Sequence, residues 1–207
     1  SVKSIESYAF YSCSKLSQLT IGESVDSIGD YAFYKCTSLK SATIPNSVKK
    51  IGNYAFFSCW SINPLTIGNS MESIGKYAFY NCSAFDSLAI PNSVKSIGKY
   101  AFDSCFDLKY LTIGNSTEEI GDYAFARCRN LTSITSNNTT PPTMTGPDVF
   151  YDVNKTTCEL IVPAESVDAY KAADQWKDFL TITPSAIEDV NADEAPARYY
   201  DLRGIET

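Results

Sequence analysis

The chain has 207 residues, with 17 Lys and Arg against 24 Asp and Glu, so its formal net charge is −7. This balance disfavours binding to nucleic acid or to an anionic membrane through a general basic field. No apolar run approaches the roughly 20 residues of a membrane-spanning helix, so we expect no membrane insertion. The sequence contains no His, which removes Ser-His-Asp and Cys-His catalysis and HExxH zinc sites.

The first residues already belong to a repeating unit. Residues 1–5 align with residues 47–51, so the sequence opens inside a repeat. Solenoids need a capping unit at each end. We therefore expect a leader, and further repeats, to precede this sequence. The alternative is that this first segment is itself the cap.

Residues 1–136 are organised by a Tyr-Ala-Phe triplet that is followed by a cysteine. Both features recur every 23 residues, without insertion or deletion. The triplets begin at Tyr8, Tyr31, Tyr54, Tyr77, Tyr100 and Tyr123, and the cysteines are Cys13, Cys36, Cys59, Cys82, Cys105 and Cys128. A fixed period of this length predicts a solenoid, in which each unit stacks only on its neighbours.

Residues 27–49 illustrate one predicted coil. Gly29 suits a turn that needs a positive φ angle. Residues 30–36 place apolar side chains at helical spacing, which predicts one helical turn facing inward. Residues 39–44 alternate as in a strand, and residues 45–47 have turn chemistry. One coil buries too little apolar surface to fold alone, so stacking must supply the rest.

The periodic cysteines do not have the spacing of a metal site or a disulfide framework. Zinc sites use pairs two to four residues apart, whereas each cysteine here is alone in its unit. Equivalent Cβ atoms of stacked coils point the same way, which is a poor arrangement for a bridge. We expect a column of buried thiols and no cofactor. Cys158 is off the period and is expected to be unpaired.

Two other groups of side chains are interpreted as structural. The tyrosines of the triplets are expected to stack as a column of rings. The carboxylates are expected at outward, solvated positions, because no pair of them is distinguished as a glycosidase pair would be. They are Asp26, Asp30, Glu72, Asp86, Asp103, Asp107, Glu118, Glu119 and Asp122.

The pattern Ile-Gly-x-x-Ala-Phe-x-x-Cys-x-x-Leu-x-x-Leu-x-Ile-Pro-x-Ser-Val resembles the 23-residue leucine-rich repeat of BspA-like surface proteins, over about residues 1–136. The resemblance implies an α/β-type right-handed solenoid with parallel strands and short helical turns. It also implies a secreted or cell-surface bacterial protein that adheres to a host or microbial protein or glycan. Gly22, Gly68 and Gly114 replace the proline of Pro45 and Pro91, which suggests duplication of a 46-residue pair.

Two features of the predicted surface are candidate ligand-binding sites. Outward positions of the strands form a ribbon of small uncharged side chains, represented by Thr43, Thr66 and Thr112; the alternative is that Thr is simply a good strand residue. Trp60 and Phe106 follow a cysteine in a surface loop, and Tyr110 is expected near Phe106. Exposed aromatics are typical interface anchors. The alternative is that they cover a thin part of the core.

The repetition ends after residue 136. Residues 137–184 are expected to cap the solenoid, with Phe150 in the role of the repeat Phe, a last strand over residues 160–163 and one helix over residues 167–179. Ser166 is the expected N-cap of that helix. Residues 185–207 are interpreted as an acidic linker, and residues 197–204 resemble the start of a Bacteroidetes-type sorting segment.

Two functions remain open at this stage. The first is a surface recognition or adhesion module that binds protein or glycan through the solenoid faces, without catalysis. The second is a structural module that spaces another domain from the cell envelope. An enzyme is not expected, because no constellation of residues indicates one.

Overall fold

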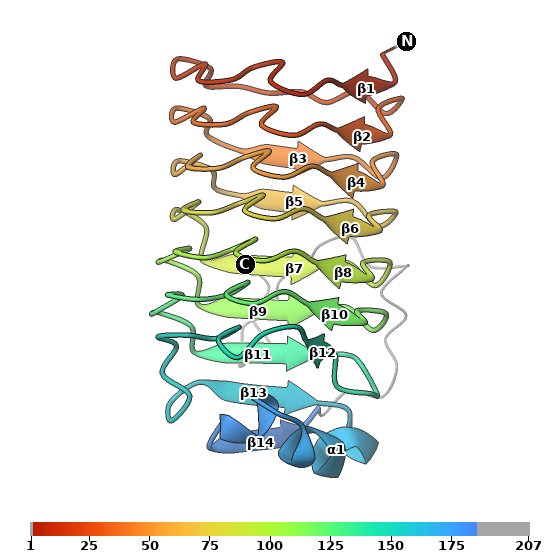
Figure 1. Ribbon diagram of the computed structural model, residues 1–207, viewed down its shortest axis with the longest axis vertical. Helices are drawn as coiled ribbons and strands as arrows, with labels where there is room; N and C mark the ends of the chain where they lie inside the picture. The colour runs from red at the N-terminus through yellow and green to blue at the C-terminus, as the bar shows by residue number, and fades with distance from the viewer. Residues whose placement is uncertain (1, 186–207) are drawn as a thin grey trace, which may run out of the picture.

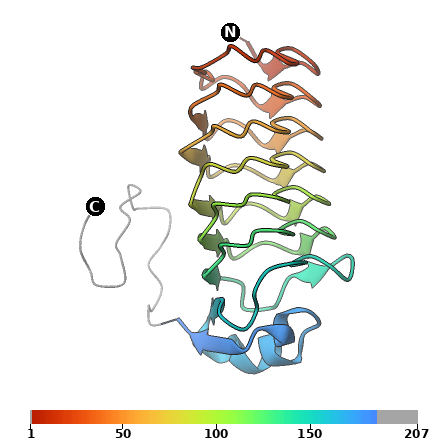
Figure 2. The same ribbon diagram turned by 90° about the vertical axis from the view of Figure 1, so that its left-hand side faces the viewer.

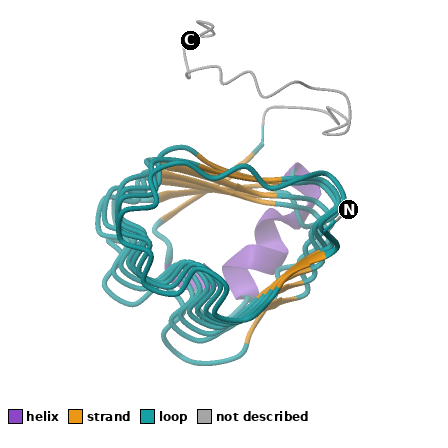
Figure 3. Ribbon diagram, turned by 90° about the horizontal axis from the view of Figure 1, so that it is seen from above, coloured by secondary structure: helices purple, strands orange, loops and turns teal. Residues whose placement is uncertain are grey.

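The computed structural model describes residues 2–185. Within them the chain winds into coils that stack along one axis (Figures 1 and 2). Viewed along that axis, successive coils superimpose around a common interior (Figure 3). The parallel-strand solenoid expected from the 23-residue period is confirmed. Of the linker and sorting-type segment predicted over residues 185–207, all but the first residue lies outside the described residues.

Two rows of parallel strands run along the stack. The shorter strands form one sheet in the order β1-β2-β4-β6-β8-β10-β12, and the longer ones form a sheet β14-β13-β11-β9-β7 and a pair β3-β5. The short row consists of β1 (Ser4–Ile5), β2 (Ser27–Ile28), β4 (Lys50–Ile51), β6 (Ser73–Ile74), β8 (Ser96–Ile97), β10 (Glu119–Ile120) and β12 (Thr143–Met144). The long row consists of β3 (Ala42–Ile44), β5 (Leu65–Ile67), β7 (Ser87–Ile90), β9 (Tyr110–Ile113), β11 (Ser133–Ser136), β13 (Glu159–Val162) and β14 (Thr181–Pro184).

The segment from Gly29 to Cys36 is not the expected helical turn. Tyr31 and Lys35 have φ angles of 58° and 55°, and the same two positions are left-handed in every repeat. The N–H groups alternate in their direction: that of Tyr31 donates to the next coil, at Asn53 O, whereas that of Ala32 closes a turn on Gly29 O. The chain therefore forms successive turns and shares its hydrogen bonds with the neighbouring coil.

The repeat glycines serve close packing rather than a positive φ angle, which corrects the expectation for Gly29. A Cβ atom on Gly29 would lie 2.5 Å from the backbone nitrogen of Ser7 in the coil above. A Cβ atom on Gly98 would lie 2.6 Å from Lys76 N. The coils approach each other closely along this row, and only Gly leaves the room.

Ring columns fill the interior. The Phe of each triplet stacks on the Phe of the next coil, with centroids 4.9 to 5.8 Å apart from Phe10 to Phe150. Phe150 takes the role of the repeat Phe, as predicted, although it follows Phe125 by 25 residues. Offset stacked rings at these distances add to the free energy gained by burying their surface.

The C-terminal end is closed by a cap with one α-helix, as predicted, but the cap differs in detail. The α-helix α1 (Val167–Ala172) ends early, because Ala173 is extended, and short 3-10 helices precede and follow it as η1 (Ala164–Ser166) and η2 (Trp176–Asp178). Ser166 does not cap with its side chain; its hydroxyl donates to Thr139 O at 2.8 Å.

Strand β14 was not predicted and lies beyond the segment expected to be last. It pairs with β13, just as β13 pairs with β11, so coil stacking continues through residues 137–184. Tyr170, Trp176 and Phe179 are buried beneath this end. Trp176 Nε1 donates to Pro142 O at 3.1 Å, and the Trp176 ring meets Phe150 edge-on at 5.4 Å. The division at residue 136 stays a prediction.

Candidate binding surfaces

The predicted Thr ribbon lies on the long strands. Thr43 and Thr66 are exposed and directly opposite each other in the β3–β5 register. Thr112 is half-buried on β9, beside Ala89 of β7 and Thr135 of β11. The structure therefore brings these positions into one ribbon of small side chains.

The three candidate aromatics are exposed. Trp60, Phe106 and Tyr110 show 49%, 38% and 53% of their surface to solvent. Trp60 and Phe106 occupy equivalent positions two coils apart, which is a separation of roughly 10 Å at the usual strand spacing. Tyr110 begins β9, four residues after Phe106. None of the aromatic ring pairs within residues 2–185 joins these three side chains to one another.

Burial of the residues beneath the loops disfavours the alternative that Trp60 and Phe106 patch the core. Cys59 and Ile62 beside Trp60 are fully buried, as are Cys105 and Leu108 beside Phe106. Coils that carry Thr37 or Ser83 at the same position are closed equally well, since Cys36, Leu39 and Cys82 are also fully buried. The repeat residues therefore close the core there without a large ring. The two large rings are therefore additions to the surface.

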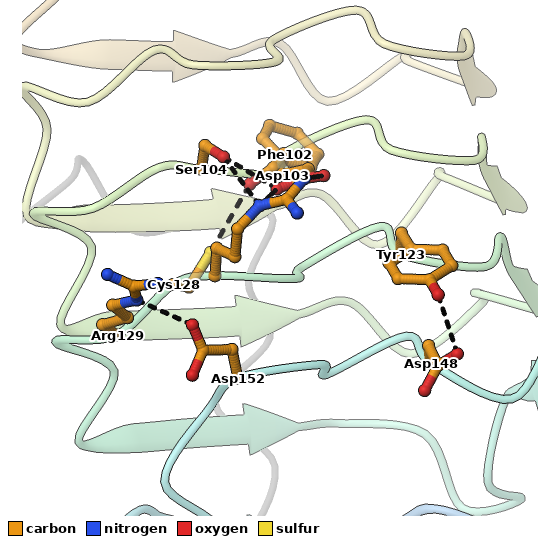
Figure 4. A network of polar contacts seen from close by, with 9 residues as sticks. Phe102, Asp103, Ser104, Tyr123, Cys128, Arg129, Asp148 and Asp152 are labelled. Carbon is orange, nitrogen blue, oxygen red and sulfur yellow. Dashed lines mark hydrogen bonds and ion pairs between the residues drawn. The ribbon is translucent and has the colours of Figure 1, made fainter.

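The tyrosines of the triplets stack as predicted. Their ring centroids are 4.6 to 4.9 Å apart from Tyr8 to Tyr123. A second column, beginning at Tyr11 and ending at Tyr80, runs beside the first. Because the ring faces contact one another, mainly their edges remain for solvent. At the end of the first column, the Tyr123 hydroxyl donates to Asp148 at 2.9 Å, and this bond raises the pKa of Tyr123 to about 12 (Figure 4).

The cysteine column is buried and unbridged from Cys36 to Cys128, as predicted, whereas Cys13 in the first coil is exposed. The thiols are more than small apolar groups. Cys59 Sγ donates to Phe33 O at 3.0 Å, and each of the other four buried thiols of the column donates to the equivalent Phe carbonyl of the coil before; Figure 4 shows the bond from Cys128 to Phe102. Burial raises the pKa of Cys82 to about 12, so the thiol keeps its proton at neutral pH.

One carboxylate departs from the expectation of a solvated face. Asp103 is fully buried, and Arg127 of the next coil donates to it through both Nε, at 2.9 Å, and Nη2. Ser104 also donates to it, at 2.9 Å. Asp103 occupies the position of Tyr80 in the previous coil, so the ion pair takes over where the second ring column ends. Burial raises the pKa of Asp103 although both partners act in the opposite direction.

Residues 2–185 contain no cluster of three or more side chains suited to holding a metal ion. No helix in this part of the chain is long and apolar enough to cross a membrane. Among the groups with a shifted pKa, Asp103 and the buried thiols of the cysteine column lie within packed or paired surroundings.

Comparison with solved structures gives similar solenoids. A leucine-rich repeat protein of T. pallidum is 32% identical, with a TM-score of 0.63 over 64% of this chain and 62% of that one. A leucine-rich repeat protein from Bacteroides ovatus is 23% identical, with a TM-score of 0.51 over 89% and 61%. A leucine-rich cell surface protein from Faecalibacterium prausnitzii is 19% identical, with a TM-score of 0.52 over 90% and 70%. The latter two likenesses concern the fold alone.

The chain spans less than two thirds of the T. pallidum and Bacteroides ovatus proteins. No curated protein matches the sequence. The family of BspA-type leucine-rich repeat regions matches residues 3–132 and 50–170, with six copies. These ranges cover most of the repeats and part of the cap, so the chain belongs to the BspA-type leucine-rich repeat family.

Proposed function

We propose that this protein is a secreted or cell-surface recognition module that binds a host or microbial protein or glycan through its solenoid faces, without catalysis. The observation that carries the proposal is the exposure of Trp60, Phe106 and Tyr110 outside a core that is complete without them. Large aromatic side chains exposed on a rigid scaffold are the residues most often found as binding anchors. The family membership and the cell-surface neighbour support the location.

The rigidity of the scaffold also favours recognition. The coils from Tyr8 to Cys128 are tied to one another by backbone hydrogen bonds, ring stacking and, in the core, thiol-carbonyl bonds. A ligand that contacts several coils would lose little free energy in ordering such a surface. The Thr ribbon beside the aromatics would supply small hydrogen-bonding groups.

The test is binding of the purified protein to an array of matrix proteins, bacterial surface proteins and glycans. Trp60→Ala and Tyr110→Ala should each weaken a saturable interaction about tenfold or more, because buried anchors contribute on the order of 1–2 kcal/mol each. Tyr151→Ala is the matched control, since Tyr151 is 51% exposed and its ring lies beside Tyr123 of the tyrosine column. If all three variants bind alike, or no ligand saturates, the alternative function as a spacer is favoured.

A further inference from the structure

A second surface, on the sheet of short strands, is a groove lined by lysines, unlike the surface that carries Trp60, Phe106 and Tyr110. A shallow groove of about 450 Å³ crosses the coils along β4, β6, β8 and β10 (the right-hand row of strands in Figure 1). Its floor includes the backbone of Gly75 and Gly98. Its sides include Lys50, Lys76 and Lys99.

The charge along this groove is opposite to that of the whole chain. Residues 49–53, 72–76 and 95–99, the segments that form three successive coils here, contain five lysines and one glutamate, a net +4 in a chain of net −7. The equivalent segment before them, residues 26–30, contains two aspartates, and the one after them, residues 118–122, contains three acidic residues. A positive band is thus bounded by acid at both ends of the groove.

Two of the three lysines are available for a ligand. Among residues 2–185, Lys50 and Lys76 take part in no ion pair, whereas Lys99 pairs with Asp122 at 3.0 Å. The hydroxyls of Ser73 and Ser96 line the same groove and have no hydrogen-bond partner within the described part of the chain. Cations and hydroxyls therefore face the groove together, and Glu119 lines it at the end where the acidic coil begins.

From this arrangement we infer that the groove binds a short acidic oligosaccharide, one whose sugars carry carboxylate or sulfate groups. Lys50 and Lys76 meet the acidic groups as point charges, the serine hydroxyls bond the sugar hydroxyls, and a ring lies flat on the glycine backbone. The inference deepens the proposed function and rests on it, because it names a ligand class for one solenoid face.

The structure favours a sugar over an acidic peptide. Extended peptides gain most of their affinity by adding a strand to a free sheet edge. Here β6 and β8 are paired on both sides, and the N–H groups of Gly75 and Gly98 are used by the coil before. The ligand must also be short, since the positive band covers three coils, or about 14 Å at the usual strand spacing.

The experiment measures binding of three tetrasaccharides to the full chain by calorimetry: an oligogalacturonide, a heparin fragment and neutral cellotetraose. We expect saturable binding of at least one acidic sugar that weakens as salt is raised, and none of cellotetraose. The two acidic arms distinguish carboxylate from sulfate. Affinity should stop rising when the acidic sugar is lengthened further, because its ends then meet the acidic flanks.

Two double variants make the result specific to the groove. Lys50→Gln/Lys76→Gln should weaken binding of the acidic sugar about tenfold. Lys40→Gln/Lys109→Gln removes the same charge from exposed lysines outside the groove and should change the affinity less than twofold. Equal losses in both doubles, stronger binding of a glutamate peptide, or no binding of either acidic sugar would overturn the inference. The proposed function is judged separately, by Trp60→Ala and Tyr110→Ala, which should leave the acidic sugar bound as before.

Discussion

The ion pair between Asp103 and Arg127 is predicted to stabilise the stack by joining its fifth and sixth coils, beyond the end of the second ring column at Tyr80. The Asp103 side chain is fully buried and the Arg127 side chain is 32% exposed, so the two partners differ in what their loss leaves behind. Removing Asp103 frees an arginine that water can still reach. Removing Arg127 strands a carboxylate that water cannot reach, with Ser104 as its remaining side-chain partner.

These differences set the magnitudes. Asp103→Ala should lower the free energy of unfolding by about 2–3 kcal/mol, which is the value of two charge-assisted hydrogen bonds reduced for the solvation of Arg127. Arg127→Met, which keeps the apolar stem, should cost about 3–4 kcal/mol at neutral pH. The double variant should cost about 2 kcal/mol less than the sum, because the second change removes a group already left without its partner.

Urea unfolding of the four proteins, followed by circular dichroism and fluorescence, measures this cycle. The pH dependence adds a second test. Because burial raises the pKa of Asp103 above its ordinary value of 3.8, the folded state takes up this proton before the unfolded state does as pH falls. Arg127 lowers that pKa against the effect of burial, so Arg127→Met should raise it further, and the folded variant should take up the proton at a higher pH than the wild type. The cost of Arg127→Met should therefore shrink as the pH falls from neutral to about pH 4. A coupling energy within about 0.3 kcal/mol of zero would show that the pair only fills space.

Two further changes test how the coils are held. Gly98→Ala should lower the free energy of unfolding by about 3 kcal/mol or more, because its Cβ would meet backbone atoms of the coil above. Gly22→Ala is the control and should be nearly neutral, because its Cβ would have nothing within 4 Å. Equal effects of the two changes would contradict the packing role of the glycine row. A thiol reagent at pH 8 should label Cys13 rapidly and the buried thiols only on unfolding, because thiolate is the reactive form. Rapid labelling of all thiols in the folded protein would refute their burial. Because the pKa of Cys82 rises from 9.0 to about 12 on folding, the stability that Cys82 contributes should be lost as pH rises from about 9 to about 12.

The interior of the coil could be predicted from the sequence because each inward position is repeated. Ala32, Phe33 and Cys36 are buried as their spacing indicates. The local conformation could not be predicted, because the same spacing suits a helix when hydrogen bonds are assumed to stay within the segment. Here alternate N–H groups leave the segment for the next coil. Tyr31 then adopts a left-handed φ angle that a bulky residue rarely takes, and the neighbouring residues of the sequence do not indicate this conformation.

A periodic signal was present for one feature that the sequence reasoning missed. Asn46 Oδ1 accepts from the backbone N–H of Asn69 at 2.7 Å, and Asn92 Oδ1 accepts from that of Asn115 at 3.1 Å. These asparagines recur every 23 residues, in step with the cysteines. The cap has no comparable periodic signal, because β14 is outside the repeat phase. The early end of α1 could not be predicted either, because neither Ala173 nor Gln175 is a residue type that usually ends a helix.

The candidate sites were identified by separating positions that must repeat for the coils to stack from positions where the residue type can vary. Stacking needs the same residue type in every coil, so each unbroken column is accounted for by packing. A residue that interrupts a column must either find a partner within the fold, as Asp103 does in Arg127, or face solvent. Trp60 and Phe106 are of the second kind. Lys50 is as well, since four other coils have Ser at its position, whereas the position of Lys76 varies and holds Asp in two coils and Lys again at residue 99. Packing does not explain these substitutions, and for that reason the two binding proposals are built on them.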